Sequence, residues 1–366
     1  MNILHVVDLI SQQTGGGSAR VPWHLAKEQA KLGHNVTIYA SDDRAGPGDA
    51  PSGVDLRLFK CWFNFMGGYR ITPSMLLANF RKFNIIHMHN YRTVVNLMAA
   101  LQGVPYVLQA LGSARPIPVP RHWYTKPWKT VNDAVWQNIL SWASRLIACS
   151  DSEVDQYVAE GADRRKCVGM PMGIDLDEYS DIPAKTDKGY RTILYLGRFH
   201  YLKAPDILVR AFSLLDIPDV RLVMVGTDDG YLGETKRIVH GLGLDDRVDF
   251  PGFVDGQAKR QLYADADVYV LPSRYEAYGL CIQEAMACGT PVIVTNRCAI
   301  ADTLPDYGCH VVDCDEKSIA DAMRSVLSKP DDTGKRAMRI WWARDHGWDR
   351  IAKQAVELYR EVLSKK

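Results

Sequence analysis

The sequence predicts an α/β fold made of two Rossmann-like domains, each a doubly wound parallel sheet. Short apolar runs rich in Val, Ile and Leu alternate with amphipathic stretches from end to end. Runs that are apolar on both faces are typical of buried parallel strands, and their alternation with helices predicts βαβ units. The length of 366 residues exceeds what one hydrophobic core usually holds, so two domains are expected.

The apolar runs give the predicted strands, and the stretches between them give the helices. In the first half the predicted strands are Ile3–Val7, Val36–Ala40, Ile85–Met88, Tyr106–Gln109 and Leu146–Cys149. In the second half they are Ile193–Leu196, Leu222–Val225, Arg247–Phe250, Val268–Leu271, Val292–Val294 and His310–Val312. Between strands, Val21, Leu25 and Leu32 share one face of a predicted helix.

A polar segment divides the chain almost in half. Residues 180–189 contain Pro and Gly and show no hydrophobic periodicity, which favours a linker. The predicted domains are therefore residues 1–180 and 190–345, facing each other across a cleft. Residues 346–366 form a last helix, expected to pack back toward the first domain. Ligands of parallel sheets bind at the carboxyl ends of strands, so the chemistry is expected in the loops that follow them.

Composition excludes several classes of protein. Hydrophobic residues make up 47% and charged residues 24%, which is typical of a globular protein and not of a disordered or fibrous one. No stretch reaches the ~20 apolar residues that span a bilayer, and no signal peptide is expected. The eight cysteines lack CxxC spacing, which favours reduced core thiols in a cytoplasmic protein and no zinc site.

Charge is balanced only over the whole chain, whose net charge is +1, so nucleic acid is not an expected partner. Between residues 57 and 149 there are eleven Lys and Arg residues and one acid, Asp133. Part of this basic segment, residues 121–129, mixes cations with aromatic side chains, and Trp136 and Trp142 follow. Such surfaces settle at anionic membranes, although an ordinary basic surface with core tryptophans remains an alternative.

Two glutamates flank a predicted helix start in the second domain. Glu276 lies in the loop after the strand Val268–Leu271, and Glu284 lies in the helix that begins near Gly279. The first amides of that helix, at Gly279 and Leu280, would form an anion site. A carboxylate on each side of a phosphate site suits a nucleotide sugar, which carries hydroxyls at both ends of a diphosphate. The alternative is that both glutamates are ordinary, with Glu276 near a helix N-cap and Glu284 on a solvated face.

Two other glycine-containing loops could approach phosphate. After the strand Ile193–Leu196, Arg198 and Lys203 flank a helix start, where two cations would match a diphosphate leaving group. After the first strand, residues 15–17 are three glycines that allow close backbone approach. This loop does not fit GxGxxG, so a nicotinamide site is disfavoured, while a merely flexible loop stays open.

These segments resemble the retaining glycosyltransferases of family 4, which have the GT-B architecture. Glu276 and Glu284 reproduce the family's Glu-x7-Glu signature, and Gly197-Arg198 with Lys203 matches its phosphate motif. Weaker similarities occur along nearly the whole chain. Where relatives often carry His-Gly, this chain has Leu111-Gly112, so the catalytic contribution of that histidine is in doubt. His87, His89 or Arg115 could replace it. For His87 and His89, however, the favoured interpretation is that they are buried histidines at the end of a strand.

The resemblance implies a role for each matched residue. Glu276 would hydrogen-bond the donor sugar and support charge at the anomeric carbon, and Glu284 would bind ribose. Arg198 and Lys203, with the amides of Gly279 and Leu280, would hold the diphosphate. Gly16 and Gly17 would close over the β-phosphate, and backbone near Phe253 would contact the base.

The implied activity is retaining transfer from a UDP- or GDP-sugar to a glycan, glycolipid or polyprenyl-linked acceptor in surface polysaccharide or lipid-linked glycan synthesis. The first domain would bind the acceptor, and the protein could lie on the inner face of the cell membrane. Neither a cofactor nor a metal is expected, because cations and the helix dipole already neutralise the diphosphate. The Asp265-Ala-Asp267 sequence is interpreted as structural. The alternatives are a nucleotide-sugar epimerase and a non-catalytic sugar-binding subunit.

Overall fold

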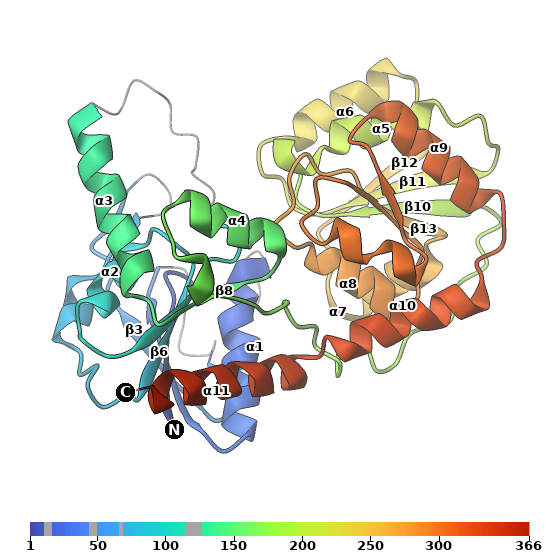
Figure 1. Ribbon diagram of the computed structural model, residues 1–366. Coiled ribbons are helices and arrows are strands. Elements are labelled where there is room, and N and C mark those ends of the chain that lie inside the picture. The colour runs from blue at the N-terminus through green and yellow to red at the C-terminus, as the bar shows by residue number, and fades with distance from the viewer. Residues whose placement is uncertain (11–16, 44–49, 66–68, 115–125, 366) are drawn as a thin grey trace. The chain divides into compact units, whose positions relative to one another are not determined.

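The computed structural model describes residues 1–10, 17–43, 50–65, 69–114 and 126–365 (Figure 1). The chain divides into two compact units. Unit 1 comprises Met1–Gly173 together with Trp348–Lys366, and unit 2 comprises Ile174–Gly347. The division falls at Gly173–Ile174, ahead of the polar segment 180–189, which contains neither helix nor strand.

Unit 1 is built on a parallel sheet in the order β3-β2-β1-β6-β7-β8-β9. These strands are β1 (Asn2–Val6), β2 (Asn35–Ser41), β3 (Val54–Phe59), β6 (Ile85–His89), β7 (Tyr106–Gln109), β8 (Arg145–Ala148) and β9 (Cys167–Gly169). A separate antiparallel hairpin joins β4 (Phe63–Phe65) to β5 (Tyr69–Ile71). Strands β1, β6 and β7 are almost wholly buried, and their apolar residues are Ile, Leu, Val, Met and Tyr, which is why their sequence runs are clear.

Helices cover both faces of the unit 1 sheet (Figure 1). They are α1 (Gly17–Lys31), α2 (Val94–Ala100), α3 (Lys126–Trp142), α4 (Asp151–Ala159) and α11 (Trp348–Ser364), with 3-10 turns at Pro73–Leu77 and Arg164–Lys166. Helices α2, α3 and α4 contribute Val95, Ile139 and Val154 to one hydrophobic core cluster with the sheet. The other face is covered by α1 and α11, which pack against each other.

The last helix, α11, is held to unit 1 by aromatic contacts at its start. Trp348 stacks on His24 of α1 with ring centroids 5.5 Å apart. A Cβ on Gly173 would lie 2.4 Å from the Trp348 ring, so only glycine lets the chain pass there. The residues that join the two units are thus closely packed on the unit 1 side.

Unit 2 is a second parallel sheet, in the order β12-β11-β10-β13-β14-β15. Its strands are β10 (Arg191–Leu196), β11 (Val220–Val225), β12 (Val248–Gly252), β13 (Val268–Leu271), β14 (Val292–Thr295) and β15 (His310–Val312). Numbered from the first strand of the unit, this is the order 3-2-1-4-5-6 of dinucleotide-binding sheets. The predicted pair of parallel α/β domains is therefore confirmed.

The helices of unit 2 also lie on both faces of its sheet (Figure 1). They are α5 (Pro205–Ser213), α6 (Leu232–Gly241), α7 (Gly256–Asp265), α8 (Leu280–Ala287), α9 (Glu316–Leu327) and α10 (Thr333–Asp345), with 3-10 turns at Tyr201–Lys203, Ala301–Thr303 and Pro305–Tyr307. Helices α5, α6 and α9 contribute Leu208, Val239 and Ile319 to one hydrophobic core cluster with the sheet.

Candidate functional site

Three of the predicted site residues gather at the carboxyl ends of two neighbouring strands in unit 2. Arg198 and Lys203 follow β10, and Glu276 follows β13. Strands β10 and β13 are hydrogen-bonded neighbours although β11 and β12 separate them in sequence. This is the point where the strand order reverses, and open α/β sheets bind their ligands there.

The turn after β10 has a backbone fixed by close packing. A Cβ on Gly226, whose φ is +149°, would lie 1.9 Å from the Gly197 carbonyl oxygen. The Tyr195 hydroxyl donates to the Arg198 carbonyl at 2.8 Å. The close approach of Gly226 and the Tyr195 hydroxyl therefore hold the turn that carries Arg198. About half of the surface of the Arg198 side chain is exposed.

Lys203 is placed by a second set of contacts. It ends the turn Tyr201–Lys203, and the amide of Arg274, from the loop after β13, donates to the Leu202 carbonyl at 2.8 Å. The Arg274 guanidinium also binds the Asp206 carboxylate through two bonds of 2.8 and 2.6 Å. Such a bidentate pair ties the loops after β10 and β13 together.

Cation and carboxylate are paired at this site. The Lys203 ammonium donates to Glu276 Oε2 in an ion pair whose side chains are 19% and 11% exposed. Arg198 Nη1 lies 2.5 Å from Asp229 Oδ2, and this pair is open to solvent. Both candidate cations thus have acidic partners in this structure, and a diphosphate would compete with those carboxylates for them.

Helix α8 presents its N-terminus beside Glu276. Gly279 caps the helix with φ +90°, in the left-handed region where a side chain is strained. A Cβ on Gly279 would also lie 2.7 Å from Ile282 Cδ1 and 3.3 Å from Glu276 Cγ. Glycine is therefore required. The Ile282 amide donates to the Gly279 carbonyl at 2.8 Å, whereas the amides of Leu280 and Cys281 come too early in the helix to have an acceptor within it. Together with the helix dipole, these amides favour an anion.

Glu284, in the second turn of α8, is held from α7. Its Oε1 lies 3.0 Å from the Lys259 ammonium, and its Oε2 accepts a hydrogen bond of 2.9 Å from the Tyr263 hydroxyl. Neither Lys259 nor Tyr263 was singled out in the sequence, where they lie in an unremarkable helical stretch. Periodicity gives no signal for such contacts because they join residues 25 and 21 positions apart.

The remaining predicted residues lie at different places. Gly16 is outside the described residues, and Gly17 is the first residue of α1 in unit 1. Phe253 directly follows β12 and its side chain is 61% exposed. Leu111, where the resemblance implies histidine, is a buried residue after β7 with φ +55°, an unusual backbone conformation for leucine.

The two aspartates of Asp265-Ala-Asp267 lie at the amino end of β13, away from the residues that follow its carboxyl end. Asp265 accepts from Lys188 at 2.8 Å and from the Thr186 amide at 2.8 Å. Asp267 accepts from Lys185 at 2.6 Å and from the Thr192 amide at 2.7 Å. These contacts fasten the polar segment before β10 to the sheet.

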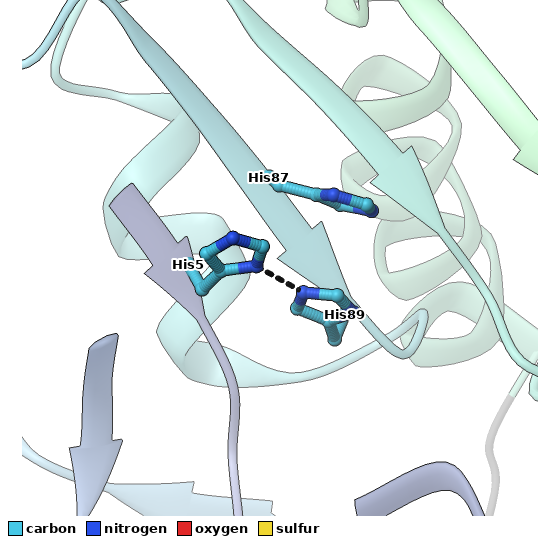
Figure 2. A group of neighbouring side chains, drawn as sticks. All are labelled: His5, His87 and His89. Carbon is cyan, nitrogen blue, oxygen red and sulfur yellow. Dashed lines mark hydrogen bonds between the residues drawn. The ribbon is translucent and has the colours of Figure 1, made fainter. Parts of the chain in front are cut away.

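A second constellation, in unit 1, consists of three buried histidines (Figure 2). His5 lies on β1, and His87 and His89 lie on β6, with their side chains fully buried. His5 Nε2 bonds the Gln29 amide oxygen at 2.8 Å, and His5 Nδ1 lies 2.8 Å from His89 Nε2. Because an amide oxygen only accepts, His5 carries its proton on Nε2, so His89 Nε2 donates to His5 Nδ1.

The chain of bonds continues to the C-terminal helix. The Gln29 amide nitrogen donates to the Tyr359 hydroxyl of α11 at 3.1 Å, and that hydroxyl bonds His87 Nδ1 at 2.6 Å. Burial lowers the pKa of His5 to about 4 and lowers the pKa values of His87 and His89 well below the usual range. All three imidazoles are therefore neutral near pH 7.

Three imidazoles are a suitable set of zinc ligands, but the arrangement of these three side chains does not fit a zinc ion. The rings of His87 and His89 are stacked 4.2 Å apart, so the lone pairs in their planes run side by side instead of converging. The 2.8 Å between His5 and His89 is a hydrogen-bond length, shorter than the ~3.3 Å between two ligands of a tetrahedral ion with bonds of ~2.0–2.1 Å. The cluster fits a buried hydrogen-bond network.

Cys281 lies between Glu276 and Glu284 in the sequence. Burial, with the charge of Glu284 second, raises the pKa of Cys281 to about 12. It is therefore protonated at neutral pH, and a thiol is a poor nucleophile compared with a thiolate. The described geometry offers no activated thiol beside Glu276.

Comparison with known proteins places this geometry in a class. Residues 15–178 match a family model described as Glycosyltransferase Family 4, and residues 179–340 match one described as Glycosyl transferases group 1. Two parallel-sheet domains matched by this pair of models define the GT-B class. The chain belongs to the family 4-like glycosyltransferases of that class, which confirms the resemblance found in the sequence.

Relatives and solved structures agree with this placement. A D-inositol 3-phosphate glycosyltransferase of Kineococcus radiotolerans is 32% identical over 262 residues, which span 62% of this chain and 59% of the relative. The matched region thus covers about three fifths of that relative's length. The sucrose-phosphate synthase of Thermosynechococcus elongatus aligns over all of both chains with a TM-score of 0.76 and 22% identity.

A second solved structure was determined with ligands. HepE of Anabaena, in complex with UDP and glucose, aligns over 99% of this chain and 100% of its own with a TM-score of 0.76 and 20% identity. At this identity the likeness concerns the fold. Within the part of the chain that the structure describes, no helix combines the length and apolar character that crossing a bilayer requires.

Proposed function

We propose that this protein is a retaining glycosyltransferase that moves a sugar from a nucleotide-diphosphate donor to a glycan, glycolipid or polyprenyl-linked acceptor. The observation that carries the proposal is the Lys203–Glu276 pair beside the glycine-capped start of α8, at the reversal point of the unit 2 sheet. A cation, a carboxylate and the amides of a helix start within one loop cluster are what a departing diphosphate and a developing oxocarbenium ion require.

Unit 2 would bind the donor. Arg198, Lys203 and the amides of Gly279 and Leu280 would hold the diphosphate, and backbone near Phe253 would contact the base. Glu284 would accept hydrogen bonds from the ribose hydroxyls.

The reaction would need no enzymic nucleophile. In a front-face substitution the bond from the anomeric carbon to the β-phosphate oxygen breaks while the acceptor oxygen adds on the same face. The leaving phosphate oxygen takes the acceptor's proton. Binding of the diphosphate would draw Lys203 toward the phosphates and release Glu276 to bind the sugar hydroxyls and support positive charge at the anomeric carbon. Each of these electrostatic contacts is expected to contribute about 2–4 kcal/mol to transition-state stabilisation.

UDP is the favoured nucleotide, with GDP second, and unit 1 would bind the acceptor. HepE binds UDP and UDP-glucose, which supports a UDP-sugar donor for this fold. The acceptor could be presented at an anionic membrane. Exposed Arg81 and Lys82, shortly before β6, and Trp142, 53% exposed at the end of α3 and shortly before β8, support a basic and aromatic surface at the amino ends of the unit 1 strands.

That surface is only part of the predicted basic segment. Arg70 is buried and bound to Asp8 at 2.6 Å and to Asp43 at 2.7 Å, and Arg92 forms an ion pair with Glu160. Co-sedimentation with vesicles containing phosphatidylglycerol tests the membrane contact. Binding that falls with salt supports it, and no binding at low salt rejects it.

The activity itself is tested by donor hydrolysis. The wild type is incubated with UDP-glucose, UDP-galactose, UDP-N-acetylglucosamine and the GDP-sugars, and release of nucleoside diphosphate is measured. Glu276→Ala and Lys203→Ala should each reduce turnover about 100-fold or more. Arg221→Ala is the matched control, because Arg221 pairs with Asp249 between β11 and β12 and lies outside the loop cluster. Unchanged turnover in both site variants would refute the proposal, and a donor epimer as product would favour an epimerase.

A further inference from the structure

The carboxylate of Glu284 is held by two donors from a single helix face. Lys259 and Tyr263 lie four residues apart on α7, so their side chains project from the same face one turn apart. The Lys259 ammonium approaches Oε1 at 3.0 Å, and the Tyr263 hydroxyl donates to Oε2 at 2.9 Å. Because each donor binds a different oxygen, the plane of the carboxylate is fixed.

Both donors are themselves buried and held by neighbouring side chains. The side chain of Lys259 is 5% exposed, and Tyr263 is fully buried with its ring 5.7 Å from that of Tyr269. Lys259 also lies 3.1 Å from Glu178 and 3.6 Å from Asp255. An ammonium between three carboxylates cannot move toward a ligand, so Lys259 acts on Glu284 and not on a phosphate.

This arrangement leaves capacity on the carboxylate. A carboxylate has about four lone-pair positions, and the two bonds from α7 use one on each oxygen. One position per oxygen remains, which matches two adjacent hydroxyl donors such as the 2′ and 3′ hydroxyls of ribose.

We infer that Lys259 and Tyr263 are the positioning residues of the nucleotide site, which aim Glu284 at the vicinal hydroxyls of the ribose. The inference rests on the proposed function, because Glu284 binds ribose only if the donor is a nucleotide sugar. It assigns discrimination between ribose and deoxyribose to α7, a helix that need not touch the donor.

Paired ligands test this role. The wild type is first titrated by calorimetry with UDP, GDP and ADP, and the tightest of these is compared with its 2′,3′-dideoxy counterpart. The wild type should bind the dideoxy compound about 10–100-fold more weakly, the range for hydrogen bonds to a charged group. Tyr263→Phe should weaken the ribose nucleotide about tenfold, as loss of orienting partners does elsewhere, and change the dideoxy compound less than twofold.

Substitutions of the lysine complete the test. Lys259→Met should show the same selective loss as Tyr263→Phe, and Lys259→Arg should recover at least half of it because a cation is restored. Tyr106→Phe is the matched control: it removes a buried hydroxyl that donates to the Ile139 carbonyl at 2.6 Å in unit 1, and it should leave both affinities unchanged.

The outcomes separate the two levels of the argument. Equal weakening of both ligands in Tyr263→Phe, or no weakening of either, overturns the positioning role while leaving the proposed function in place. A wild type that binds none of the three nucleotides overturns the proposed function and the positioning role together. A loss confined to the ribose nucleotide supports both.

Discussion

Mild acid should destabilise unit 1 through its buried histidines, and the size of the effect follows from their burial. His5, His87 and His89 are neutral in the folded protein because burial lowers their pKa values, that of His5 to about 4. In the unfolded chain a histidine has a pKa of about 6.5. As the pH falls below 6.5 the unfolded state gains protons that the folded state does not, so the free energy of unfolding decreases.

The loss in free energy of unfolding is calculated for each histidine separately. At pH 5.5, one unit below the unfolded pKa, each histidine contributes a loss of about 1.4 kcal/mol relative to pH 7.5. Three such residues give about 4 kcal/mol, a large share of the ~5–15 kcal/mol that stabilises a typical domain. The loss for His5 continues as the pH falls toward its folded pKa of about 4 and then levels off.

The assay is urea unfolding at pH 7.5, 6.5 and 5.5, followed by tryptophan fluorescence. His5→Gln retains hydrogen-bonding groups but cannot take up the proton, so its loss between pH 7.5 and 5.5 should be smaller than that of the wild type by about 1.4 kcal/mol. His240→Gln is the control, since His240 is exposed and its removal should leave the difference unchanged.

One result would refute this reasoning. If wild type, His5→Gln and His240→Gln lose the same free energy over this pH range, the buried histidines do not remain neutral in the folded protein. The hydrogen-bond chain from His89 through His5, Gln29 and Tyr359 to His87 would then need a different protonation.

Three further outcomes are expected. Tyr359→Phe breaks that chain and should lower the free energy of unfolding by about 1–2 kcal/mol, measured by urea unfolding at pH 7.5; no change would mean the hydroxyl is dispensable. Gly226→Ala should distort the turn after β10, since its Cβ would lie 1.9 Å from a carbonyl oxygen, and it should both lower the melting temperature and abolish donor hydrolysis; a stable, active variant would contradict the packing. Glu276→Gln keeps the size of the side chain but removes its charge, so kcat for donor hydrolysis should fall about 100-fold with little change in nucleotide affinity; a fall in affinity alone would place Glu276 in ground-state binding.

The predicted strands are confirmed where both faces are buried. Tyr106–Gln109 and Val268–Leu271 agree with the buried strands β7 and β13 to the residue, and His310–Val312 agrees with β15, a half-buried edge strand. Strand β3 was missed because it lies at the sheet edge, where Val54–Phe59 alternates exposed and half-buried residues and includes Asp55 and Arg57. The edge strand β9 and the hairpin of β4 and β5 are three-residue strands too short to show a period.

Part of the candidate site was also predictable. A helix was expected from near Gly279, and α8 begins at Leu280 with Gly279 as its cap. The glycine at position 279 indicates a helix start without any tertiary contact, because a cap residue with a left-handed backbone conformation favours glycine in any fold. In contrast, Asp229, Lys259 and Tyr263 carried no signal, since each acts through a partner that is distant in the sequence.

The sequence by itself determined the two-domain α/β class, the strands of the core and the loops in which Arg198, Lys203 and Glu276 lie, because local apolar periodicity follows directly from burial. Only the tertiary structure decided that β10 and β13 are neighbours, so that Lys203 meets Glu276 across 73 residues. It also decided that α11 packs on unit 1, so that Tyr359 meets His87 across 272 residues. Strand order depends on how whole sheets and helices pack, and no local pattern carries that information.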